Sequence, residues 1–160
     1  MGALIRDIDP ADLPWVLALN LAHEVELSPL NEGRLAALID AATYARAAEG
    51  GAFLIGFDQS ADYDSENFLW HRARREKFLY VDRIAVAATH RRRGLAAALY
   101  ADLFAFAAER GLERVVAEVN AEPPNPASDA FHARLGFVTV GEARLKAREK
   151  TVRYIERVLD

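Results

Sequence analysis

A basic turn, Arg91-Arg92-Arg93-Gly94-Leu95-Ala96, stands between a predicted strand and a predicted helix. The N–H groups in the first turn of a helix lack internal partners and carry the positive end of the helix dipole, so they can bind a phosphate group. Gly94 and Ala96 are small enough to let an anion approach the main chain, and the guanidinium groups would steer a polyphosphate inward. The turn therefore predicts an anion site. A solvated basic turn before an ordinary helix would have the same sequence pattern. The turn lacks both the spaced glycines of a dinucleotide fingerprint and the Gly-Lys-Ser/Thr of a Walker sequence.

A second polar pattern begins at Asn125, just before Pro126. Asn125, Ser128 and His132 are spaced i, i+3 and i+7, so on a helix they form a polar line beside a core stripe of Ala127, Phe131 and Leu135. An amide, a hydroxyl and an imidazole in one line could follow an extended polar ligand. The alternative is a helix cap followed by two surface polar residues.

The elements that would position these residues follow from hydrophobic periodicity. Strands are predicted at residues 4–8, 52–57, 78–86, 115–119, 138–140 and 152–158, and helices at 13–21, 31–49, 95–110 and 125–135. Residues 58–77 mix polar and aromatic side chains without a clear period, and one interpretation of this segment is a short helix after Ser65. Strands that alternate with helices indicate an α/β (α+β) fold with a mixed sheet and a central strand-helix-strand crossover.

Composition limits the classes of protein that fit. A chain of 160 residues with 52% hydrophobic and 28% charged residues suits one domain over residues 1–160. It has no cysteine, which excludes disulfides, thiolate metal sites and a cysteine nucleophile. We expect a cytoplasmic protein without a secretory signal, a membrane segment or a bound metal. The net charge of −4 argues against a nucleic-acid-binding domain built on the short basic run at residues 90–93.

Together these segments resemble the GNAT family of N-acetyltransferases. The family's Gln/Arg-x-x-Gly-x-Gly/Ala signature is matched by residues 91–96, and its later Asn-x-x-Ser/Ala motif, with an aromatic pair and Gly-Phe, by residues 125–137. The resemblance rests on sequence motifs over residues 78–137. Over the first fifty residues it rests only on the order of the predicted elements. It implies a mostly antiparallel twisted sheet with helices on both faces. It also implies acetyl-CoA as acyl donor and an amine as acceptor, and dimers are common among similar proteins.

The resemblance also implies which residues hold the coenzyme. Main-chain N–H groups of the basic turn and of the start of the next helix would bind the pyrophosphate. These residues are Arg91, Arg92, Arg93, Gly94, Leu95, Ala96 and Ala97. The pantetheine arm would pair with the end of the strand at Ile84 and Val86, and Asn125 and Ser128 would contact it from the other side.

His132 occupies the position where the family usually has a tyrosine as general acid, while members similar to those that acetylate phosphinothricin carry histidine there. A tyrosine with a pKa of ~10 holds its proton at neutral pH, whereas a histidine with a pKa of ~6.5 is mostly neutral. His132 therefore needs a raised pKa to act as an acid, or it serves as a base, and Tyr80 or Tyr63 would be the acid in its absence.

An attacking ammonium must lose a proton, and two carboxylates compete for that role. Glu118 interrupts an apolar strand and looks like the base of the ribosomal-protein alanine acetyltransferases. Asp82 is the rival, since some members place an acid there. For either carboxylate the alternative is a structural pair with Arg83 or Arg114.

Residues 62–70 combine carboxylates with aromatic rings, which suits a cationic amine. We expect the substrate wall to consist of Tyr63, Asp64, Asn67, Trp70 and Tyr80. A surface loop with its aromatic rings packed inward explains this segment equally well. A small-molecule amine or an amino acid is favoured as acceptor over a protein N-terminus, and a non-catalytic acyl-CoA-binding module of the same fold is the alternative function.

Overall fold

The computed structural model describes residues 4–24, 27–145 and 149–160. Seven strands form one sheet in the order β1-β2-β3-β4-β5-β7-β6. The strands are β1 (Ile5–Asp7), β2 (Tyr44–Ala48), β3 (Ala52–Asp58), β4 (Phe78–Val86), β5 (Arg114–Glu122), β6 (Val138–Leu145) and β7 (Lys150–Val158). Among these described strands, β4 and β5 are the one parallel pair, and the helix α4 (Leu95–Glu109) joins them. The predicted mixed, mostly antiparallel sheet with a central crossover is confirmed.

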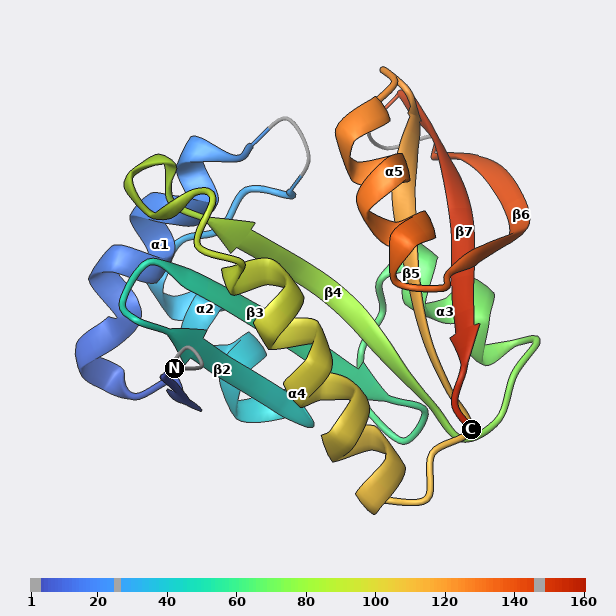
Figure 1. Cartoon of the computed structure of the whole chain (residues 1–160), viewed down its shortest axis with the longest axis horizontal. Helices are drawn as coiled ribbons and strands as arrows, with labels where there is room; N and C mark the ends of the chain where they lie inside the picture. Colours follow the sequence, from blue (N-terminus) through green and yellow to red (C-terminus); the bar gives the residue numbers. More distant parts are fainter. Residues whose placement is uncertain (1–3, 25–26, 146–148) are drawn as a thin grey trace.

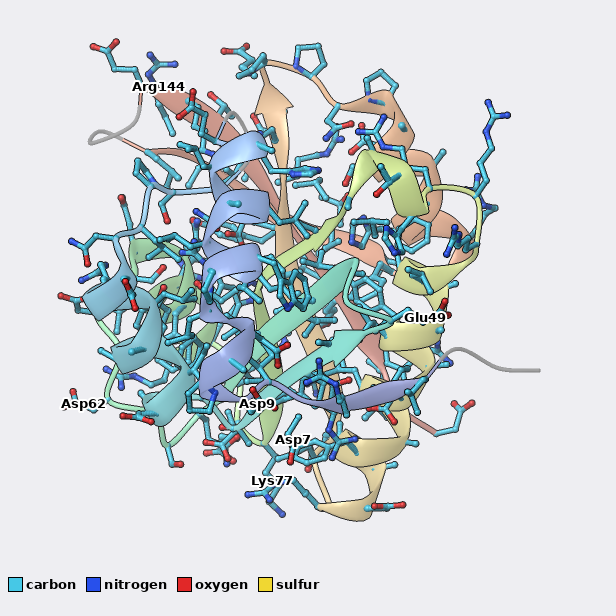
Figure 2. All side chains as sticks on the ribbon, turned by 90° about the vertical axis from the view of Figure 1, so that its left-hand side faces the viewer. Asp7, Asp9, Glu49, Asp62, Lys77 and Arg144 are labelled. Atoms are coloured by element: carbon cyan, nitrogen blue, oxygen red, sulfur yellow. The ribbon has the colours of Figure 1, made fainter. Side chains whose placement is uncertain are left out.

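Helices cover both faces of the sheet (Figure 1). One face carries α1 (Leu13–Ala22), α2 (Glu32–Ala41) and α3 (Glu66–Arg72), and the other carries α4 and α5 (Pro126–Arg134). The two larger apolar clusters of buried residues each involve one of these sets of helices. The first buries Leu99 and Leu103 of α4, and the second buries Val16, Leu35 and Phe68 under the other helices. Figure 2 views the molecule from the α1 side and shows α1 and α2 to one side of the strands and α4 and α5 to the other.

The sequence prediction of one helix over residues 31–49 is wrong in its second half. The helix α2 ends at Ala41, and residues 44–48 form β2 between β1 and β3. Three alanines in Tyr-Ala-Arg-Ala-Ala favour a helix locally. Two flanking strands satisfy this segment's backbone in the sheet instead, so tertiary pairing overrides the local preference. The predicted short helix after Ser65 is confirmed as α3, whose first turn is capped by the Ser65 hydroxyl.

None of the helices in the described ranges has the length and apolar character that crossing a membrane requires. Within the same ranges, no group of three or more histidine and acidic side chains is placed to hold a metal ion.

His71 attaches α3 to β5. Its Nε2 lies 3.2 Å from the carbonyl oxygen of Ala117, and burial lowers the pKa of the ring from 6.5 to about 4. The folded state therefore binds fewer protons at His71 than the unfolded state between these two pH values, so stability should fall as pH drops from about 6.5 to about 4. We expect His71→Gln, which keeps an amide donor without a titrating ring, to flatten this part of the stability profile in urea titrations. An unchanged pH slope in the variant would contradict this.

Candidate active site

The strands β4 and β5 separate in the middle of the sheet. They pair only over Phe78–Tyr80 and Arg114–Val116, and beyond this point they diverge (Figure 1). A cavity of about 420 Å³ occupies the opening, lined by residues 81–86 of β4, 117–120 of β5, the start of α4 and one side of α5. Because this edge of β4 has no strand partner there among the described residues, its backbone groups can pair with an extended ligand.

A bulge in β4 accompanies the divergence. Ile55 of β3 pairs with Arg83 and Gly56 pairs with Val81, so Asp82 is the extra residue on β4. A bulge of this kind bends its strand and redirects a side chain. At Gly56, opposite the bulge, a Cβ would lie 3.0 Å from the carbonyl oxygen of Tyr80, a close approach that favours glycine.

The basic turn leads into α4 as the sequence predicts. Gly94 is the N-cap residue with φ +71°, and no side chain caps the helix. Apart from its chain neighbours and the backbone of α4, no described atom lies within 4 Å of where a Gly94 Cβ would be, so a side chain there would enter open space. Arg91 and Ala96 line the cavity beside this turn, while Arg93 is exposed. This is the geometry of an anion site at a helix N-terminus.

On the other side of the cavity, Asn125 caps α5. Its Oδ1 accepts a hydrogen bond of 3.2 Å from the Ser128 N–H, and both residues line the cavity together with His132. The polar line predicted from the spacing of these residues therefore faces the cavity, and the capping role named as its alternative is present too.

His132 is buried, and protein groups surround both of its ring nitrogens. Nδ1 lies 2.8 Å from the carbonyl oxygen and 3.2 Å from the Oγ of Ser128, and Nε2 lies 2.8 Å from the hydroxyl oxygen of Tyr100. Burial lowers the pKa of His132, against smaller opposing effects of the Ser128 carbonyl and Asp129. A histidine that acts as an acid needs a raised pKa, and the environment of His132 lowers its pKa instead.

No arginine among the described residues pairs with Glu118. Its carboxylate accepts hydrogen bonds of 2.9 Å from the Tyr80 hydroxyl and from Asn67 Nδ2, and Asn67 in turn accepts one from the Tyr154 hydroxyl. Burial first, and then the negative charge of Asp82, raise the pKa of Glu118 from 4.5 to about 8, while Tyr80, Lys150 and Asn67 oppose the rise. Arg114, one of the two arginines considered for it, pairs with Glu156 at 3.0 Å.

Asp82, unlike Glu118, forms the structural pair with an arginine that the sequence offered as the alternative to a catalytic role. Arg83 Nε donates to it at 2.9 Å, and the Tyr63 hydroxyl donates to it at 2.7 Å. The buried Arg83 guanidinium also donates to Asn20 Oδ1 and to the Ser28 hydroxyl and carbonyl, which connects β4 to the segment after α1. Asp82 is thus held in a network with the buried Arg83, whereas Tyr80 and Asn67, both neutral donors, hydrogen-bond to Glu118.

A second cavity, of about 350 Å³, meets the first at Asp82 and Glu118. The predicted wall residues Tyr63, Asp64, Asn67 and Tyr80 line it. Trp70 lines neither cavity. It stacks on Tyr154 with ring centroids 4.0 Å apart, and a Cβ on Gly141 of β6 would overlap its ring. Within residues 62–70, Tyr63, Asp64 and Asn67 thus line a cavity, as the substrate-wall interpretation expects, whereas Trp70 packs inward, as the surface-loop interpretation expects. Asp62, at the start of this segment, points away from the protein (Figure 2).

Sequence reasoning missed three residues of this region. Tyr100 and Lys150 line the larger cavity, and Arg83 was considered only as a partner of a carboxylate. The one available signal for Tyr100 was a tyrosine in an otherwise apolar helical run. Lys150 is 6% exposed, and its place depends on how β7 pairs with β5 and β6, which no local pattern shows.

Comparison with known proteins agrees with this geometry. The ribosomal-protein-S18-alanine N-acetyltransferase from Escherichia coli is 19% identical, with a TM-score of 0.69 over 99% of this chain and 94% of that one. Ard1 from Thermoplasma volcanium is 16% identical, with a TM-score of 0.79 over 100% and 99%. A phosphinothricin acetyltransferase from Sinorhizobium meliloti, solved in complex with acetyl-CoA, is 20% identical, with a TM-score of 0.72 over 99% and 89%.

A search of curated protein sequences gave no match. The model of the acetyltransferase (GNAT) family matches residues 15–137, which span the divergent strands, the basic turn and α5. This protein therefore belongs to the GNAT acetyltransferase family, whose acyl donor is acetyl-CoA.

Proposed function

We propose that the protein is an N-acetyltransferase that moves the acetyl group of acetyl-CoA to a primary amine by direct attack in a ternary complex. The observation that carries this proposal is the position of Glu118, a carboxylate with a pKa near 8 where the two cavities meet. One cavity would hold the donor and the other the acceptor. The chain has no cysteine, which agrees with transfer that does not pass through a cysteine acyl-enzyme.

The larger cavity and the turn beside it would hold acetyl-CoA, which supplies the activated acyl thioester. The unpartnered first turn of α4, from Gly94 to Ala97, would bind the pyrophosphate, with Arg91, Arg92 and Arg93 at its rim. The free edge of β4 at Ile84 and Val86 would pair with the pantetheine arm, and Asn125 and Ser128 would contact it from α5.

Glu118 would act as the general base. In its ionised form one carboxylate oxygen takes a proton from the ammonium of the acceptor, which leaves a neutral nitrogen able to attack. A base works best when its pKa lies near the operating pH, and a value of about 8 meets this condition better than the ordinary value of 4.5. Tyr80 and Asn67 fix the carboxylate in place at the junction.

We propose a small amine or an amino acid as acceptor, in preference to a protein N-terminus. The second cavity is of small-molecule size at about 350 Å³. It carries carboxylates of Asp64, Glu66 and Asp82, which would attract a cation, and the aromatic rings of Tyr63 and Tyr80.

The test is release of free coenzyme A thiol from acetyl-CoA over a panel of amines, amino acids and peptides. Small amines should give turnover above the hydrolysis background, and peptides should give less. Calorimetric binding of acetyl-CoA without thiol release across the whole panel would instead favour the non-catalytic module.

Asp82→Asn should move the pH dependence of the reaction. The charge of Asp82 raises the pKa of Glu118, so its removal should lower that pKa, and the unpaired Arg83 would lower it further. We expect the rising limb of kcat/KM to move to lower pH, measured with the best amine of the panel. Because the substitution leaves Arg83 buried without its anion, Tm should also fall. A limb that stays in place or moves to higher pH would contradict this assignment.

A further inference from the structure

Tyr100 lies on α4 in the wall of the larger cavity, and its side chain is completely buried. Its hydroxyl lies 2.8 Å from His132 Nε2, which joins α4 to α5. The rings of Phe104, Phe131 and Phe137 surround the pair, so this hydrogen bond is made in an apolar setting.

The hydrogen-bond partners determine where the protons of this pair are. The Ser128 carbonyl oxygen can only accept, so the nitrogen 2.8 Å from it, Nδ1 of His132, must carry a hydrogen. Because burial lowers the pKa of His132, the ring is neutral near pH 7 and its Nε2 has a lone pair without a hydrogen. Tyr100 must therefore be the donor in the bond to Nε2.

His132 consequently has no proton to give to a group in the cavity. Its single N–H is directed to Ser128, and its other nitrogen is an acceptor for Tyr100. Tyr100 carries the O–H on the Nε2 side of the His132 ring, whereas the hydroxyl of Ser128 lies on the Nδ1 side, 3.2 Å from that nitrogen. The hydroxyl hydrogen of Tyr100 can turn about the Cζ–Oη bond without any movement of the ring.

We infer that Tyr100, and not His132, donates the hydrogen bond that stabilises the coenzyme A sulfur as it leaves. This rests on the proposed function. When the bond between the acyl carbon and sulfur breaks, the electron pair goes to sulfur, and a thiolate is a stronger acceptor for the O–H than a neutral imidazole. Burial raises the pKa of Tyr100 far above its ordinary value, so the proton stays on the tyrosine and the thiolate takes its proton from solvent after release. His132 is a positioning residue, since its Nε2 holds the hydroxyl in place before the sulfur is charged.

Other charged groups also contribute to the electrostatic field in this cavity. Glu118 of β5, Asp82 of β4, Lys150 of β7 and Arg91 at the basic turn line the cavity, and Asp129 lies next to His132 on α5. A test must therefore separate the hydroxyl of Tyr100 from the general field of these charges. Tyr100→Phe does so, because it removes one uncharged O–H and leaves every charge in place.

The thiol of bound coenzyme A should be titrated through the ultraviolet absorbance of its thiolate, as a difference spectrum against the protein alone. A donor that bonds the thiolate lowers the pKa of that thiol, so Tyr100→Phe should raise it and reduce the thiolate fraction at a given pH by about tenfold. Tyr44→Phe is the matched control. It also removes a buried hydroxyl, but one that donates to Asp102 and lies outside the cavity wall.

A bound thiol whose pKa is the same in Tyr100→Phe and in the unsubstituted protein would overturn the inference while leaving the proposed function intact. Failure of the unsubstituted protein to bind coenzyme A would instead count against the proposed function.

A second measurement needs no variant that could fail to fold. In nitrogen NMR of the unsubstituted protein, His132 should be protonated at Nδ1 only across neutral pH. The Nε2 signal should move toward that of a free lone pair when coenzyme A binds as the thiolate. A hydrogen on Nε2, or a charged ring at neutral pH, would make His132 the donor and overturn the inference.

Discussion

Glu118→Gln is expected to lower kcat roughly a hundred- to ten-thousand-fold, the range over which a positioned general base contributes. Glutamine has the same shape and keeps an oxygen that can accept from Tyr80 and Asn67, so the junction of the two cavities should stay intact. The KM for acetyl-CoA should change little, because the proposed coenzyme contacts lie on β4, α4 and α5. Steady-state kinetics at saturating amine would measure both quantities.

The pH profile separates a base from a merely structural carboxylate. In the unsubstituted protein, kcat/KM should rise through a pH of about 8, where Glu118 loses its proton, and the variant should lack this limb. Glu122→Gln is a matched control, since Glu122 lies on the same strand with a side chain that is 73% exposed. Turnover of Glu118→Gln equal to that of the control would refute the assignment of Glu118 as the base.

The same substitution should stabilise the protein at alkaline pH. The pKa of Glu118 is raised in the folded state, so the folded state binds more protons at this residue than the unfolded state between pH 4.5 and 8, and stability falls as pH rises through that interval. Glutamine removes this loss. We expect the Tm of the variant to exceed that of the unsubstituted protein above pH 8 and to approach it near pH 4.5. A lower Tm at alkaline pH would show that the loss of activity comes from damaged structure.

Gly94→Glu is expected to weaken acetyl-CoA binding at least about a hundredfold. The side chain would enter the open space before the first turn of α4 and bring a negative charge to the N–H groups proposed to bind the pyrophosphate. The loss of two or more hydrogen bonds to a charged group is enough for an effect of this size. Calorimetric titration with acetyl-CoA would measure it.

Gly111→Glu is the control for backbone strain. Gly111 follows the other end of α4 with φ +73°, against +71° for Gly94, and at neither position does an atom lie within 4 Å of where a Cβ would be. Both variants therefore carry the same conformational cost, and only the one at the basic turn should lose binding. Equal losses in both would point to destabilised α4 instead of a blocked anion site.

Much of this architecture follows from local sequence. The turn at residues 91–96 and the helix from Asn125 are defined by glycine, proline and capping residues, whose backbone preferences act over a few positions. These two segments were enough to indicate the family that the match over residues 15–137 confirms. Local preference failed at residues 44–48, where alanines that favour a helix are placed in the sheet by the strands on either side.

The choice between the two carboxylates was open from the sequence, because both lie on predicted strands and both have arginines nearby in the chain. Their partners come from far along it: Asn67 is 51 positions from Glu118, and Tyr80 is 38. In the structure Arg83 pairs with Asp82 and Arg114 pairs with Glu156, while Glu118 accepts hydrogen bonds from Tyr80 and Asn67 and has a raised pKa.

The sequence by itself determined the basic turn, the polar line on α5 and the alternation of strands and helices, since each depends on neighbours within a few residues. Only the tertiary structure decided that β4 and β5 diverge at Tyr80, that two cavities meet at Glu118, and that burial beside Tyr100 lowers the pKa of His132. The reason is physical: the pKa of a side chain and its hydrogen-bond partners depend on burial and on which distant segments pack against it.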